Sequence, residues 1–112
     1  MAAGPVRGFP DRAQALAALL AYAALSVAFF GFPILRDPAH VYIGRGGDAT
    51  LMIWFLAWWP YALGHGLNPL VTHLVWAPTG VNLGWTTAIP GAGILAAPIT
   101  LAFGPVVAYN FL

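Results

Sequence analysis

The chain has 112 residues, of which 61% are hydrophobic and 6% are charged, whereas a soluble domain carries about a quarter charged residues. This composition argues against a soluble globular protein, and lipid is the expected solvent over much of the length. The four scattered arginines form no basic patch for nucleic acid, and the absence of cysteine excludes disulfides and thiolate chemistry.

The first predicted element is a transmembrane helix over residues 13–35, preceded by a tail of residues 1–12 in which Asp11 is placed to cap the helix. These 23 residues carry no charge, and as a helix they would measure about 34 Å, enough to cross a hydrocarbon core of about 30 Å. A signal peptide has an apolar region of about 7–15 residues, so an uncleaved span is favoured. Two arginines lie on each side of it, so the terminal amine alone favours a cytoplasmic N-terminus.

Residues 36–104 are predicted to form the first external loop, with two helices that lie along the membrane surface. The first helix covers about residues 49–65 and contains Pro60, which is expected to kink or end it. Its length of about 16–18 residues and its cluster of tryptophans favour an interfacial position over a second span. The second apolar piece, residues 90–103, is interrupted by proline and is too short to cross a bilayer.

Three further segments complete the predicted architecture. Residues 70–76 are compatible with a turn of helix or an extended loop, and Ala77-Pro78-Thr79-Gly80 predicts a turn. Residues 105–112 begin an apolar helix, which we interpret as the truncated start of a second transmembrane helix in a longer protein. The expected class is therefore an all-α membrane protein with one full transmembrane helix and interfacial helices in an external loop.

Asp48 is the last charged residue of the chain, and the 64 residues that follow it are uncharged. It can act as the N-cap of a helix that begins at Ala49. It can also be a general base or metal-binding carboxylate, because an ionisable group beside membrane-embedded segments is costly and is a functional candidate by default. The sequence favours neither interpretation. Arg45 is expected to pair with Asp48, with a phosphate as the alternative partner.

The remaining polar and aromatic residues have structural interpretations beside functional ones. His40, His65 and His73 follow no metal-ligand spacing, so they are interpreted as loop residues and no metal site is predicted. The five tryptophans are expected to be interfacial anchors, although residues such as Trp54 could also stack on a sugar. Asn68, which precedes a proline, is interpreted as a cap residue.

Several short motifs follow one another in a recognisable order. They are Gly47-Asp48-Ala49, the tryptophan-rich residues 54–59, His65-Gly66-Leu67-Asn68-Pro69, Pro78-Thr79-Gly80-Val81-Asn82-Leu83, Ala97-Pro98, and the run from Gly104-Pro105 to Asn110-Phe111-Leu112. Over residues 13–112 this order resembles the N-terminal part of bacterial multi-pass membrane glycosyltransferases of the GT-C superfamily.

The resemblance implies an enzyme of the inner (cytoplasmic) membrane that transfers a sugar from a polyprenyl-phosphate donor to an acceptor at the outer face. It implies that Asp48 is the acidic residue of the first external loop that acts on the acceptor's proton. The candidate substrate-binding residues are Arg45, Trp54, His65 and Asn68. Many members have two adjacent acidic residues, whereas alanine follows Asp48 here, which weakens the case for a divalent metal, and no cofactor is predicted. The donor-binding part would lie downstream, so the fragment alone is expected to be inactive.

A non-catalytic alternative is a structural membrane subunit or a transporter fragment, because transporters also contain short, proline-broken apolar helices. In a transporter these breaks lie at the bilayer midplane, whereas the enzyme interpretation places residues 48–103 at the outer surface. Both interpretations predict the lipid bilayer as a partner.

Overall fold

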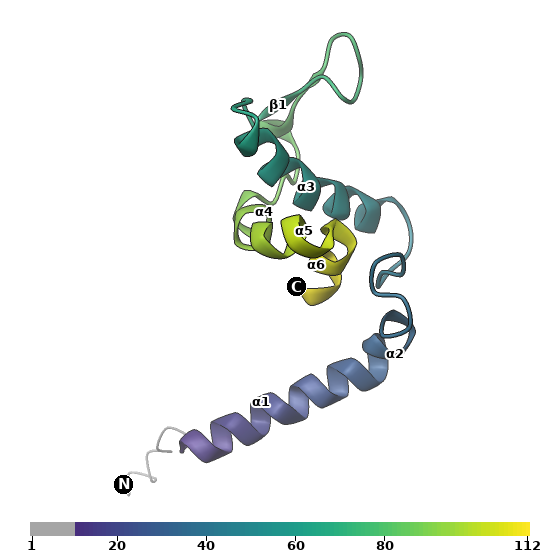
Figure 1. Ribbon diagram of the computed structural model, residues 1–112, viewed down its shortest axis with the longest axis vertical. Coiled ribbons are helices and arrows are strands. Elements are labelled where there is room, and N and C mark those ends of the chain that lie inside the picture. Colours follow the sequence, from purple (N-terminus) through teal and green to yellow (C-terminus); the bar gives the residue numbers. More distant parts are fainter. Residues whose placement is uncertain (1–10) are drawn as a thin grey trace, which may run out of the picture. The chain divides into compact units, whose positions relative to one another are not determined.

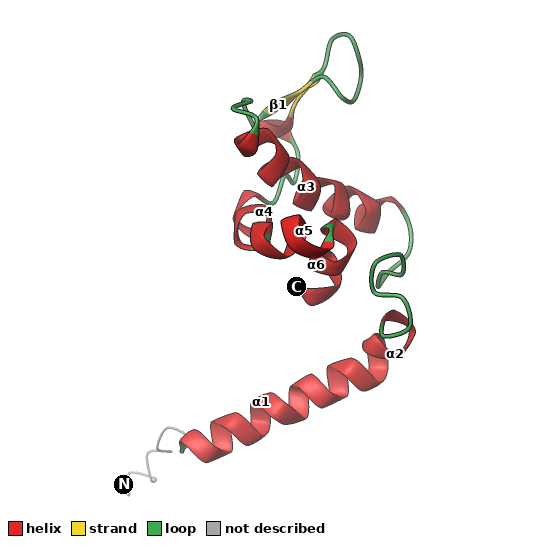
Figure 2. Cartoon of the chain, in the orientation of Figure 1, coloured by secondary structure: helices red, strands yellow, loops and turns green. Residues whose placement is uncertain are grey.

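The computed structural model describes residues 11–112, and most of the predicted tail lies outside this range. The chain divides into two units, Met1–Phe32 and Pro33–Leu112, which are considered separately. The described residues are mostly helical, with one pair of very short strands, as Figure 2 shows. The predicted helical class is confirmed, apart from this strand pair.

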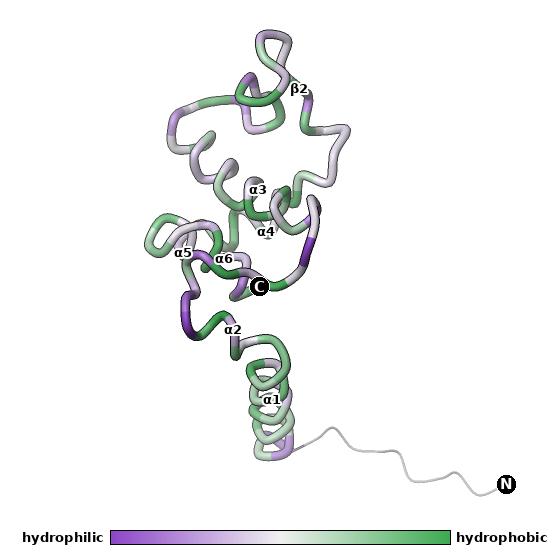
Figure 3. The backbone as a smooth tube through the Cα atoms, turned by 90° about the vertical axis from the view of Figure 1, so that its right-hand side faces the viewer, coloured by the Kyte–Doolittle hydropathy of each residue, from purple (hydrophilic) through white to green (hydrophobic). Residues whose placement is uncertain are grey.

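The N-terminal unit consists of α1 (Arg12–Ser26) and a π-helical turn (Val27–Gly31), and α2 (Phe32–Ile34) continues the run. Asp11 caps α1 as predicted, since its Oδ1 accepts a hydrogen bond of 2.8 Å from the N–H of Ala13. The continuous helix Arg12–Ile34 has 23 residues and is long and apolar enough to cross a membrane. No residue of α1 is buried, and Figure 3 shows its hydrophobic character along most of its length.

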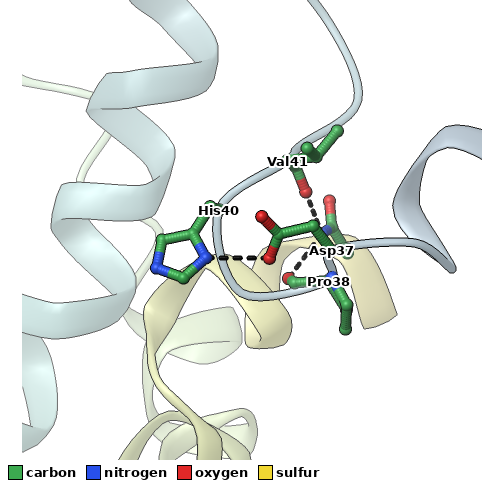
Figure 4. A network of polar contacts seen from close by, with 5 residues as sticks. Asp37, Pro38, His40 and Val41 are labelled. Atoms are coloured by element: carbon green, nitrogen blue, oxygen red, sulfur yellow. Dashed lines mark hydrogen bonds and ion pairs between the residues drawn. The ribbon is translucent and has the colours of Figure 1, made fainter.

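The connector between Ile34 and α3 is folded by its own hydrogen bonds. The carbonyl oxygen of Asp37 accepts from the N–H groups of His40 and Val41 at 3.3 and 2.9 Å. The carboxylate of Asp37 also contacts Nδ1 of His40 at 2.8 Å (Figure 4). Residues 37–41, soon after helix Arg12–Ile34, therefore form a turn that is held by these hydrogen bonds.

The long helix of the second unit is α3 (Gly47–Gly64), which has 18 residues. It begins two residues before the predicted start and continues through Pro60 to Gly64, one residue short of the predicted end at about residue 65. Of the two effects expected of Pro60, a kink or an end of the helix, the end does not occur. The helix ends where Gly66 adopts a positive φ of 65° and the N–H of Leu67 bonds to the carbonyl of Ala62 at 2.8 Å. This is the Schellman arrangement, in which glycine takes the left-handed position without steric cost.

A short antiparallel hairpin follows α3. Its strands are β1 (Val71–Thr72) and β2 (Val81–Asn82), with Val71 opposite Asn82 and Thr72 opposite Val81. A 3₁₀ turn, η2 (Leu83–Trp85), continues from β2. Residues 70–76 were predicted to form either a turn of helix or an extended loop, and the structure contains the extended form.

Three short helices complete the second unit: α4 (Pro90–Leu95), α5 (Ala97–Phe103) and α6 (Pro105–Phe111). The predicted apolar piece of residues 90–103 is helical but is divided at Ala96, with Pro98 in the first turn of α5, where its missing N–H costs little. All three helices contact α3. Figure 1 shows them on one side of α3 and the hairpin on the other.

The core of this unit lies on both sides of α3. On the hairpin side, Phe55, Trp59 and Ala62 pack with Leu83 and Ala88. On the other side, Leu56 packs with Ala96 and Ala108 of the short helices. With both sides covered, α3 is an internal element of a folded unit rather than a helix lying alone on a membrane surface.

Two of the predicted interfacial tryptophans belong to this core. Trp58 and Trp59 are only 4% and 5% exposed. Their indole N–H groups donate to the carbonyl oxygens of Pro69 and Ala88, at 2.8 and 2.6 Å. The interpretation of these two residues as interfacial anchors is therefore wrong, because the chain after Gly66 folds back and covers them. Trp76 and Trp85 remain 79% and 90% exposed.

Candidate functional site

Asp48 lies in the first turn of α3, and its side chain is exposed. Gly46, not Asp48, is the N-cap residue, and the only side-chain bond at this end runs from Oγ1 of Thr50 to the carbonyl of Gly47 at 2.8 Å. The predicted capping role of Asp48 is therefore wrong. Within residues 11–112 its carboxylate has no hydrogen bond or ion pair, and the helix dipole favours a negative charge at this position.

Arg45 does not pair with Asp48 in the described part of the chain, so the expected ion pair is wrong. Arg45 stands between Gly44 and Gly46, whose φ angles of 105° and 88° turn the backbone sharply just before the helix. Both side chains are exposed. A cation and a carboxylate three residues apart are thus both available to a ligand at this end of α3.

An apolar groove of about 300 Å³ begins one helical turn after Asp48. Leu51, Trp54 and Phe55 of α3 form one wall of the groove. Residues three apart on a helix lie on the same face, so Asp48 lies on the same side of α3 as Leu51, one turn before the groove. The opposite wall is formed by Val75, Trp76, Val81, Leu83 and Thr86, from the hairpin and the turn after it.

Trp54, predicted to bind substrate, lines this groove but is not a freely exposed stacking platform. It is half-buried, and its ring stacks on Trp58 with a centroid distance of 5.5 Å and an interplanar angle of 6°. Trp54 contributes an apolar surface to the groove, and stacking on the indole of Trp58 holds its ring in place. The structure therefore brings Trp54 into the same half of α3 as Asp48.

His65 and Asn68 lie at the other end of α3. Seventeen residues separate His65 from Asp48, which corresponds to about 25 Å along a helix axis. His65 packs on Tyr61, and its Nδ1 lies 2.8 Å from the Tyr61 carbonyl oxygen. Oδ1 of Asn68 accepts from the N–H of Leu70 at 3.0 Å, as expected for a residue that organises a turn.

A second hollow, of about 380 Å³, lies at this end and contains Asn68 but not Asp48. Its walls include Trp58, Tyr61 and His73. The five candidate residues thus fall into two groups, with Arg45, Asp48 and Trp54 in or just before the first half of α3 and His65 and Asn68 just after its end. Within residues 11–112 no cluster of three or more His, Cys, Asp or Glu side chains is placed to bind a metal ion.

Tyr109 and Asn110 of α6 fix the backbone that leads into the site, a role that sequence reasoning missed. The amide nitrogen of Asn110 donates to the carbonyls of Val41 and Pro38 at 2.7 and 3.2 Å, and the Tyr109 hydroxyl donates to the Ile43 carbonyl at 3.1 Å. Asn110 is the only polar amide in an otherwise apolar helix, and this was the available signal.

The groove and the two charges together suit an amphipathic ligand. A hydrocarbon chain could occupy the groove, while a hydroxyl donates to the Asp48 carboxylate and an anionic group faces Arg45. Comparison of the chain with protein-family models, with curated protein sequences and with solved structures finds no match.

Proposed function

We propose that this chain is the N-terminal part of an integral membrane glycosyltransferase of the inner membrane. The enzyme would transfer a sugar from a polyprenyl-phosphate donor to an acceptor hydroxyl at the outer face. The observation that carries the proposal is the exposed carboxylate of Asp48, which has no partner within residues 11–112 and lies in α3 one helical turn before the apolar groove that begins at Leu51. Residues 49–112 carry no formal charge, so none of them offers a cationic side chain to this carboxylate.

In this mechanism the acceptor hydroxyl donates a hydrogen bond to Asp48 and attacks the anomeric carbon of the donor sugar. As the new C–O bond forms, the proton passes to the carboxylate and the polyprenyl phosphate leaves from the opposite face, which inverts the anomeric centre. The leaving phosphate carries away the electron pair of the broken bond. The guanidinium of Arg45 can bind this anionic phosphate. Leu51, Trp54 and Phe55 would contact the apolar part of a lipid-linked substrate.

The test is Asp48→Asn, expressed from the complete reading frame in which these residues occur. Asparagine preserves the size of the side chain but cannot accept a proton, so sugar transfer should fall by about 10²–10⁴-fold. Asp48 makes no contact within residues 11–112 that holds the fold together, so the amount of protein in the membrane should not change.

Asp37→Asn is the matched control, because it makes the same chemical change at an exposed aspartate of the connector that contacts His40 instead of the groove. This variant should retain transfer. Normal transfer by a well-expressed Asp48→Asn protein would contradict the proposal.

A further inference from the structure

The loop of the β1–β2 hairpin presents three consecutive apolar side chains to the outside. Leu74, Val75 and Trp76 are 67%, 38% and 79% exposed. Figure 1 shows this loop projecting beyond the two short strands. Exposed apolar area costs about 25 cal/mol per Å² in water, so a run of this kind calls for a partner that removes it from water.

The hairpin loop is held by specific bonds and close packing. The N–H of Leu74 donates to Oγ1 of Thr72 at 3.2 Å, and the N–H of Gly80 donates to the carbonyl of Trp76 at 2.9 Å. Gly80 has a φ of 74°, and a Cβ atom there would collide with the ring of His73 and the carbonyl of Thr72. The apolar side chains are therefore presented in a fixed arrangement.

Trp76 combines two unfavourable features. Its φ of 54° places a bulky residue in the left-handed region, at a cost of about 1–2 kcal/mol. Its indole is also largely exposed. A strained residue that displays an apolar group is a reason to look for a binding partner outside the chain.

The chemistry of the surrounding residues indicates which partner this is. Residues 49–112 contain no formally charged side chain, so the hairpin can enter a low-dielectric layer without burying a charge. Tryptophan is enriched at membrane–water interfaces, where its apolar ring and its N–H are both accommodated. The second unit begins at Pro33, within the last residues of helix Arg12–Ile34, so the chain joins the unit that carries the hairpin directly to that helix.

We propose that Leu74, Val75 and Trp76 insert into the interfacial layer of the bilayer and anchor the second unit to the membrane. This proposal requires that helix Arg12–Ile34 crosses the membrane, but it does not depend on glycosyl transfer. Since the hairpin has no lysine or arginine to attract anionic headgroups, its insertion is expected to depend neither on anionic lipid nor on salt.

The experiment uses the complete chain, which contains no cysteine, reconstituted into phosphatidylcholine vesicles. Leu74→Cys and Ala39→Cys are each labelled with an environment-sensitive fluorophore. Ala39 is the matched control, because it is small and exposed and lies between Pro38 and the polar residue His40 in the connector. Emission from position 74 should shift to the blue, lose quenching by aqueous iodide and gain quenching by nitroxide-labelled lipid.

Emission from position 39 should remain accessible to iodide. The difference between the two positions should persist when phosphatidylserine is added and when the salt concentration is raised. Equal iodide quenching at both positions would place the hairpin in water and overturn the proposal. Protection from iodide without quenching by the labelled lipid would place the hairpin against protein, which would also overturn it.

Discussion

Gly93 and Gly91 stand two positions apart in α4 but have opposite surroundings. A Cβ atom on Gly93 would lie 2.5 Å from Cδ1 of Trp59, whereas one on Gly91 would meet nothing within 4 Å. Gly93→Ala should therefore force Trp59 out of its place and destabilise the second unit by about 1–3 kcal/mol. Gly91→Ala should be neutral or stabilise by up to about 1 kcal/mol, because alanine loses less backbone entropy in a helix.

Unfolding of the two variants in detergent, followed by tryptophan fluorescence, measures this difference directly. Trp59 is itself buried and hydrogen-bonded to Ala88, so its emission should report the loss of packing. Equal stabilities for the two variants would contradict the close packing of Gly93 on the indole ring.

The residue scale also shows what could not be predicted from the sequence. Both glycine and aspartate are common N-caps, so the run Gly46-Gly47-Asp48 is compatible with several helix starts, and only the positive φ of Gly46 identifies the cap. The location of the tryptophans was also ambiguous, because an apolar ring is stable both in lipid and in a protein core. The bond from Trp59 to Ala88, 29 residues away, depends on how the later chain folds back.

At the scale of elements, predictions based on local composition were the more successful. The cap at Asp11, the apolar helix that follows it and the helical nature of residues 90–103 were all evident from residue type and spacing. Pro60 was expected to kink or end its helix, and α3 continues through it, because packing on both sides of α3 holds a helix that proline weakens locally.

The attachment of the connector to α6 gives an element-scale prediction. Asn110 bonds to backbone groups of Pro38, Val41 and Ile43, and each exposed hydrogen bond contributes at most about 1 kcal/mol. Asn110→Ala should therefore destabilise the connector locally by about 1–2 kcal/mol. Amide hydrogen exchange at Val41 and Ile43 should accelerate about tenfold, since about 1.4 kcal/mol corresponds to a factor of ten.

Asn82→Ala is the control for this change, because the amide oxygen of Asn82 bonds only to its near neighbour Gly84 in the hairpin. It should leave exchange in the connector unchanged. Unaltered exchange in Asn110→Ala would show that the connector holds its shape without α6, and Asn110 would then have no part in positioning Arg45 and Asp48.

At the scale of the whole molecule, charge is distributed very unevenly. All seven charged residues lie within the first 48 positions, and the described helix Arg12–Ile34 separates them into two groups. In the sequence, Arg7 precedes this helix and Arg12 begins it, whereas Arg36 and Arg45 follow it. The positive-inside rule therefore gives no preference from arginines alone, and the terminal amine favours a cytoplasmic N-terminus only slightly.

This balance makes the orientation of the helix a prediction that a small change can test. In intact cells, a membrane-impermeant maleimide should label Ala39→Cys from outside and should label Gly4→Cys only after lysis. Ala39 is preferred to Gly46 because the φ of 88° at Gly46 would strain a cysteine. Labelling of Gly4→Cys from outside would contradict the predicted orientation. Because the arginines are balanced, adding Arg12→Gln to both labelled chains should move a measurable fraction to the opposite orientation, whereas Arg36→Gln should reinforce the original one.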